Sequence, residues 1–136
     1  MSYLLDTNVV SETRRRRPDA NVVRWLEGAE VGQLYISALV LGEIRRGIEL
    51  LRGRDPVQAD GYERWLLSVA VQYASRVLPI TADIADAWGR LNAPSPLPPA
   101  DGLMLATARV HGLTFVSRDH AGLLHAGVPV LNPFEG

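Results

Sequence analysis

Short apolar segments alternate with amphipathic segments along this chain, and the alternation limits the folds that it can adopt. The apolar segments of strand length lie at 2–6, 34–36, 77–80, 114–116 and 128–131. Between them, apolar residues recur at the three- and four-residue spacing of a helix that faces a core. Strands that alternate with helices form βαβ units, which build a mostly parallel sheet with helices on both faces. We therefore expect a single α/β domain over residues 1–136, with a sheet of four or five strands.

Residues that cap or break helices mark the expected helix boundaries. The helices are predicted at 8–15, 20–28, 38–53, 56–75, 82–91 and 100–111. Asp19, Ser37 and Thr81 are suited to cap helix N termini, Pro56 suits a first turn, and Gly112 suits a helix end.

Two of these helices, 38–53 and 56–75, follow each other without a strand between them. We expect them to form a helical pair that projects from the sheet. The pair carries more apolar and aromatic residues than one sheet face can cover, Tyr62 and Trp65 among them. Part of it is therefore predicted to be a homodimer interface.

The composition excludes several kinds of protein. The chain has no cysteine, so disulfides and thiolate chemistry are excluded, and it has no lysine, because all fourteen basic residues are arginines. No segment of about 18 apolar residues and no secretory signal pattern is present, so we expect no membrane span and a cytoplasmic location. The net charge of −1 gives no overall attraction to nucleic acid.

Four acidic residues lie where an expected strand gives way to a helix, or early in the helix that follows. They are Asp6, Glu43, Asp101 and Asp119. In an open parallel sheet, ligands bind in the crevice at the carboxyl ends of the strands. Carboxylates brought there from four elements would repel each other unless a cation lay between them. Oxygen ligands without cysteine favour Mg²⁺ or Mn²⁺, so the pattern predicts a metal-dependent enzyme that acts on phosphate.

Each of these acids also has a purely structural interpretation. Asp6, Asp101 and Asp119 could cap helices or occupy first turns, where the helix dipole favours acids. Glu43 lies near the apolar stripe of its helix, and Arg46 at i+3 is a candidate partner. Independent caps would not all need to be acidic, which favours a shared site.

Polar residues accompany the acids and are candidates to orient carboxylates or metal-bound waters. They are Thr7, Asn8, Ser37 and Ser117. Capping and turn formation are their alternative roles.

Arginines near the acids are candidates to bind phosphate, because the guanidinium group can bind two oxygens at once. They are Arg14, Arg15, Arg16, Arg17 and Arg118.

Several segments, in order and across nearly the whole chain, resemble PIN-domain ribonucleases of the VapC type, the toxins of bacterial toxin–antitoxin pairs. The matching segments are 4–12, 36–47, 100–108, 116–119 and 131–134. The resemblance implies that Asp6, Glu43, Asp101 and Asp119 are catalytic metal ligands. Gly122 stands where such proteins often carry a further acid, which bears on whether a second metal binds.

The resemblance implies Mg²⁺- or Mn²⁺-dependent hydrolysis of phosphodiester bonds in single-stranded RNA, with Asp6 or Asp101 as a candidate acceptor of the water proton. It also implies an antitoxin partner, which would insert a helix or an arginine into the acidic site, and a homodimer.

Two alternatives to this function stay open. A haloacid-dehalogenase-type phosphatase would use Asp6 as nucleophile, but Asn8 stands where that family has a second Asp. A non-catalytic binding module would use the acids only as helix caps.

Overall fold

The computed structural model describes residues 1–94, 96–118 and 127–136, which form a five-stranded parallel sheet with helices on both faces. The strands are β1 (Tyr3–Leu5), β2 (Leu34–Ser37), β3 (Val77–Leu78), β4 (Thr114–Val116) and β5 (Val130–Leu131). The helices are α1 (Thr7–Glu12), α2 (Ala20–Gly28), α3 (Ala38–Arg52), α4 (Pro56–Gln72), α5 (Ala82–Asn92) and α6 (Pro99–His111). Short 3₁₀ turns span Val31–Gln33, Ala74–Arg76 and Pro133–Glu135. The expected fold class is confirmed.

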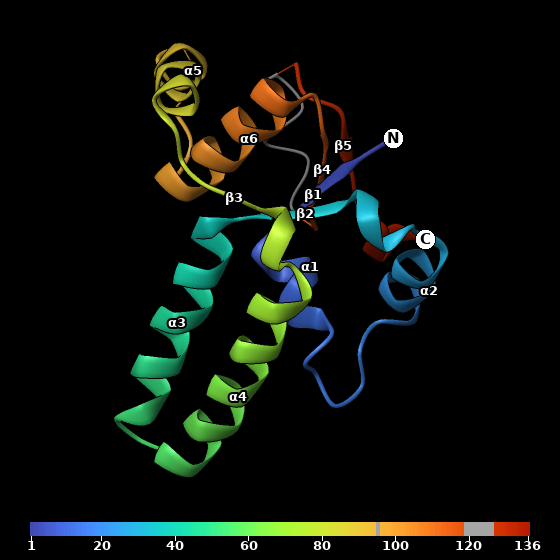
Figure 1. The fold of residues 1–136 in the computed structure, drawn as a ribbon, viewed down its shortest axis with the longest axis vertical. Helices are drawn as coiled ribbons and strands as arrows, with labels where there is room; N and C mark the ends of the chain where they lie inside the picture. Colours follow the sequence, from blue (N-terminus) through green and yellow to red (C-terminus); the bar gives the residue numbers. More distant parts are fainter. Residues whose placement is uncertain (95, 119–126) are drawn as a thin grey trace.

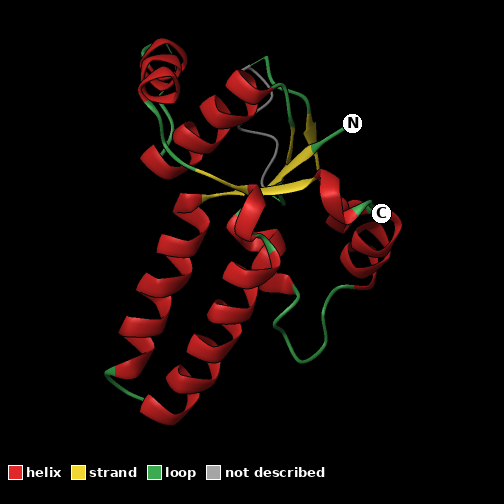
Figure 2. Cartoon of the chain, viewed as in Figure 1, coloured by secondary structure: helices red, strands yellow, loops and turns green. Residues whose placement is uncertain are grey.

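The sheet has the strand order β3-β2-β1-β4-β5, and every adjacent pair is parallel. Its centre is β1, whose Leu4 and Leu5 are fully buried. The strands gather in the middle of the molecule, as Figure 2 shows. Both edge strands are shorter than expected, because Pro79 and Pro129 have no N–H to donate to the ladder and lie beside β3 and β5.

Most helix starts follow the expected caps. The side chains of Asp19, Ser37 and Thr81 accept hydrogen bonds from backbone N–H groups of the turns that follow them. Gly112 ends α6 in the left-handed conformation, with φ of 66°. The expectation that the first helix runs to residue 15 is wrong. It ends at Glu12, after which the chain continues in i→i−3 turns toward Pro18.

The helices lie on both sides of the sheet, and α3 and α4 form a hairpin that extends well beyond it (Figure 1). The predicted projecting pair is therefore confirmed. Tyr62 and Trp65 are half-buried and line a pocket next to α1. The exposed large apolar residues of α4 are instead Val57, Leu67 and Val71. None of the helices within the described ranges combines the length and apolarity needed to cross a membrane.

Candidate functional site

The centre of the candidate site is the end of β1, where the chain changes direction across the sheet. From β1 the chain adds β2 and β3 on one side, then returns to add β4 and β5 on the other. The carboxyl ends of β1 and β4 therefore form a topological switch point, which is the common ligand site of open α/β sheets. Asp6 follows β1 directly, and Ser117 follows β4 directly.

Asp6 is held by hydrogen bonds on both carboxylate oxygens. Its Oδ1 accepts from the Thr7 N–H at 2.7 Å, and its Oδ2 accepts from the Ser117 hydroxyl at 2.7 Å. The Asn8 amide also donates to Oδ2, at 3.4 Å. Only 8% of Asp6 is exposed. The pKa of its carboxyl is raised, chiefly by burial, with smaller contributions from the charges of Asp101 and Glu43, while the hydrogen bonds from Ser117 and Thr7 act in the opposite direction.

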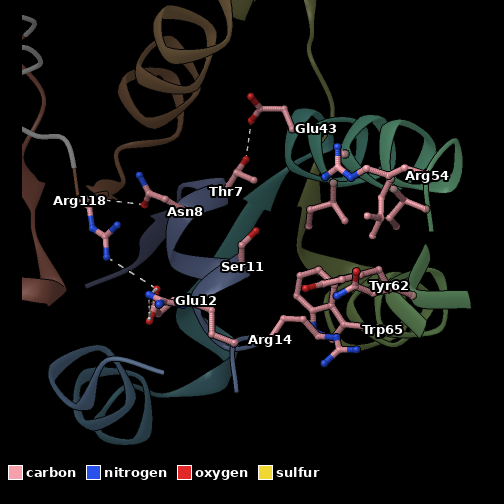
Figure 3. A pocket seen from close by; sticks show the side chains of 16 residues that line it. Thr7, Asn8, Ser11, Glu12, Arg14, Glu43, Arg54, Tyr62, Trp65 and Arg118 are labelled. Atoms are coloured by element: carbon pink, nitrogen blue, oxygen red, sulfur yellow. Dashed lines mark hydrogen bonds and ion pairs between the residues drawn. The ribbon is translucent and has the colours of Figure 1, made fainter. Parts of the chain in front are cut away.

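Glu43 reaches the same region from the second turn of α3. Its Oε1 accepts a hydrogen bond of 2.5 Å from the Thr7 hydroxyl, which joins α3 to α1. The suggested pairing with Arg46 is wrong, because Glu43 is exposed and its carboxylate turns toward Thr7 (Figure 3). Ser37 is buried and caps α3 by accepting from the Leu39 N–H, so it sets where the helix that carries Glu43 begins.

Asp101 approaches from the opposite side, in the first turn of α6. It is half-buried, and its charge contributes to the raised pKa of Asp6. Three of the four predicted acids therefore interact electrostatically at the switch point. The fourth, Asp119, lies outside the described residues, as does Gly122.

Among the acids in the described ranges, the structural interpretation applies to Asp6 and Asp101 but not to Glu43. Asp6 is the N-cap of α1. The N-cap position of α6 is Pro98 rather than Asp101, and Glu43 lies inside α3. Asp101 instead occupies the first turn of α6, which is the other structural position expected for it. Neither a cap nor a first-turn position explains Glu43, which lies in the second turn of α3.

The donor chemistry of this site suits a hard divalent cation, because carboxylates and hydroxyls supply its oxygens. The repulsion that Asp6 experiences from Asp101 and Glu43 is also what a cation would offset. In the described part of the chain, however, no three acidic, histidine or cysteine side chains lie at the spacing of a metal-ligand group. The hydrogen bond to Thr7 draws Glu43 toward α1. The residues therefore fit a metal in chemistry, while a complete ligand set is not formed by these residues alone.

The predicted phosphate-binding arginines have different surroundings. Arg14 packs its guanidinium over the ring of Tyr62 at 4.7 Å, and Arg15 contacts the Glu12 carboxylate at 3.4 Å. Arg16 and Arg17 are exposed.

Arg118 is exposed, but its side chain contacts two other residues at the protein surface. Its guanidinium lies 3.9 Å from the centre of the Phe134 ring and 3.8 Å from Glu12. Its backbone N–H donates to the Asn8 amide oxygen at 3.3 Å.

Glu12 is a site residue that the sequence reasoning missed. It is a buried carboxylate, only 4% exposed, and it accepts the backbone N–H of Asp19 at 2.8 Å. The available signal was its position on α1, one turn after Asn8, which places the two on the same helix face as residues i and i+4.

A groove of about 620 Å³ lies between α1 and the α3–α4 hairpin, and of the three acids at the switch point Glu43 lines it (Figure 3). Thr7, Asn8 and Glu43 line it at the acidic end, while Tyr62 and Trp65 of α4 line it farther along. Its remaining lining residues are Ser11, Glu12, Arg14, Arg15, Ile44, Gly47, Ile48, Leu51, Arg54, Gln58 and Arg118. The groove can therefore accept an extended or helical ligand that has both apolar and charged groups.

The chain is similar to known proteins both in sequence and in structure. A family model described as "PIN domain" matches residues 3–127. VapC ribonuclease Y4jK of Sinorhizobium fredii is 32% identical over 139 residues, covering 97% of each chain. The crystal structure of FitAcB from Neisseria gonorrhoeae has a TM-score of 0.90 at 33% identity, covering 98% of this chain and 99% of that chain. A toxin–antitoxin complex from Klebsiella pneumoniae has a TM-score of 0.74 at 25% identity, covering 97% and 98%.

Proposed function

The chain belongs to the PIN-domain family, and from this premise we propose that it is a metal-dependent endoribonuclease of a toxin–antitoxin pair. Its substrate in this proposal is single-stranded RNA in the cytoplasm, and its reaction is phosphodiester hydrolysis. The observation that supports the proposal most is the buried Asp6 carboxylate at the switch point of the sheet, whose pKa the charges of Asp101 and Glu43 help to raise. The similarity to a VapC ribonuclease over 97% of the chain supports the same activity.

Asp6, Glu43 and Asp101, together with Asp119, would hold Mg²⁺ or Mn²⁺ in this proposal. When bound, the metal would polarise a phosphate oxygen and lower the pKa of the attacking water. The hydrogen bonds from Ser117 and Thr7 orient the Asp6 carboxylate, and the Thr7 hydroxyl orients Glu43. Asp6 or Asp101 would accept the proton of the attacking water.

The groove provides a path for RNA away from the acidic end. Arg14 and Arg15 line it, and Arg16 and Arg17 follow them on the exposed turn. Contacts from these arginines to phosphates would make RNA binding weaker at high salt. Arg118 would contribute mainly by positive potential, because its guanidinium is held by Glu12 and Phe134.

The same groove is our proposed surface for the antitoxin. Its floor of Ile44, Ile48 and Leu51 suits the apolar face of a helix, and its acidic end suits an arginine. A structural relative is a toxin–antitoxin complex, which supports a protein partner of this kind. We also propose a homodimer, for which the exposed Leu67 and Val71 on α4 are the candidate contacts.

Cleavage of a labelled single-stranded RNA, with Mg²⁺ or with EDTA, tests the proposed activity. The chain offers a matched pair of variants. Asp101→Asn removes an acid from the first turn of α6, and Asp83→Asn removes one from the first turn of α5. We expect cleavage to need metal, to fall by orders of magnitude in Asp101→Asn, and to stay unchanged in Asp83→Asn. Wild-type cleavage rates in Asp101→Asn would refute the assignment of the site.

A further inference from the structure

Helix α5 covers the outer side of the helix that carries Asp101. It packs chiefly against α6, and the two lie side by side at one end of the molecule (Figure 1). Ile84 is fully buried in α5, whereas most other residues of this helix are exposed or half-buried. The packing of α5 is therefore one of the contacts that hold α6, together with those that α6 makes with β1 and β4.

The two helices are in close contact at Gly102, the residue after Asp101. A Cβ added at Gly102 would lie 2.9 Å from both Cδ1 and Nε1 of the Trp88 indole and 3.5 Å from Asn92 Oδ1. Trp88 and Asn92 are one turn apart on α5. The indole therefore packs directly on the backbone of α6, and position 102 has no room for a side chain. At Gly89, next to Trp88, an added Cβ would meet nothing within 4 Å.

The residues around the start of α6 make few of the usual helix-end interactions. The N-cap residue, Pro98, makes no side-chain capping hydrogen bond. Asn92 Oδ1 accepts the Leu97 N–H at 2.8 Å, which ties the connection between the two helices to α5. The Trp88 Nε1 is buried without a hydrogen-bond partner among the described residues, so its contact with Gly102 is one of shape.

We propose, on the basis of the proposed function, that Trp88 is a positioning residue for the acidic site. Its indole, packed on Gly102, sets the first turn of α6 and hence the place of the Asp101 carboxylate relative to Asp6. The role is indirect, since Trp88 acts through the backbone of α6 and contacts none of the reacting atoms. A misplacement of about 1 Å in a catalytic arrangement can lower a rate by roughly a hundredfold.

Two glycine substitutions on the paired helices test this role. Gly102→Ala adds a methyl group against the indole, and Gly89→Ala adds the same group in open space. Both changes raise helix propensity. We expect Gly102→Ala to lower kcat for RNA cleavage at least tenfold with KM changed less than threefold. We also expect a smaller rise in Tm on adding Mg²⁺ than in wild type. Gly89→Ala should match wild type in both measurements.

A double-mutant cycle shows whether the loss acts through the indole. Trp88→Ala removes the group that the added methyl would meet, so Gly102→Ala should cost less than threefold in kcat in that background. Trp88→Ala alone should lower kcat with little change in KM, because the first turn of α6 loses its support.

Three results would overturn the positioning role of Trp88. The first is a wild-type kcat in Gly102→Ala, and the second is an equal loss of kcat from Gly102→Ala with and without Trp88. The third is a Trp88→Ala variant with the wild-type kcat and the wild-type rise in Tm on adding Mg²⁺. The last of these decides the matter if Gly102→Ala fails to fold. Absence of RNA cleavage by wild type would refute the proposed function instead, and the Mg²⁺-dependent Tm of the variants would still test the role of Trp88.

Discussion

Replacing Asp6 by asparagine should stabilise the metal-free protein at neutral pH while weakening its response to Mg²⁺. Like charges about 8 Å apart repel by roughly 2 kcal/mol at an effective dielectric near 20. In the other direction, the hydrogen bond from Ser117 becomes weaker by about 1 kcal/mol when its acceptor loses its charge. We therefore expect Asp6→Asn to gain about 1 kcal/mol in EDTA, or roughly 3 °C in Tm for a chain of this size.

The pH dependence of this difference follows from the raised pKa of the Asp6 carboxyl. Because the folded protein holds this proton more tightly than the unfolded chain does, the stability contributed by Asp6 is complete below its ordinary pKa of 3.8. It is lost as the pH rises through the raised folded-state pKa. Asparagine does not titrate, so the Tm advantage of Asp6→Asn should be small at the lowest pH and should grow as the pH rises above 3.8.

Magnesium should reverse the order of the two proteins. Free Mg²⁺ at about a hundred times its dissociation constant stabilises a protein that binds it only when folded by roughly 2.7 kcal/mol, which corresponds to about 9 °C here. Asp6→Asn should gain clearly less. Melting curves in EDTA and in Mg²⁺, between acidic and neutral pH, measure all three effects. If Mg²⁺ leaves the wild-type Tm unchanged, or if the Tm difference in EDTA does not vary with pH, the reasoning about this site is wrong.

Three further predictions concern other parts of the molecule. Glu12→Ala should lower the free energy of unfolding in urea by about 2–3 kcal/mol, because it leaves the Asp19 N–H without its acceptor; an effect below about 0.5 kcal/mol would contradict this. Leu67→Glu should convert the proposed dimer to a monomer in size-exclusion chromatography with light scattering, and a monomeric wild type would disprove the dimer. Arg14→Ala should weaken RNA binding and reduce its salt slope by about one, measured by fluorescence anisotropy, whereas Arg90→Ala on α5 should change neither.

The features that could be predicted from the sequence are those that local interactions determine. Asp19, Ser37 and Thr81 cap their helices as expected, because a capping hydrogen bond joins residues two or three positions apart. The placement of Asp6 could also be predicted, because a residue that directly follows a central parallel strand lies at the carboxyl edge of the sheet.

The features that could not be predicted depend on contacts between distant parts of the chain. Local spacing suggested Arg46 as the partner of Glu43, yet the packing of α1 against α3 brings the Thr7 hydroxyl to its carboxylate. Nothing local distinguished Glu12, which lay inside the helix expected at 8–15. Its burial arises from the start of α2 and from Arg118, which is 106 residues away along the chain.

The role of Arg118 also explains how the site keeps its negative charge. An arginine beside several acids would ordinarily neutralise one of them, but the guanidinium of Arg118 contacts Glu12 and the Phe134 ring instead of Asp6 or Glu43. The hydrogen bonds to the Asp6 and Glu43 carboxylates come from a backbone amide, an asparagine amide and hydroxyls, which are neutral donors. A cation supplied from outside, whether a metal ion or an arginine of a partner, would therefore meet the same carboxylates, so the proposed metal and the proposed antitoxin arginine should compete for one site.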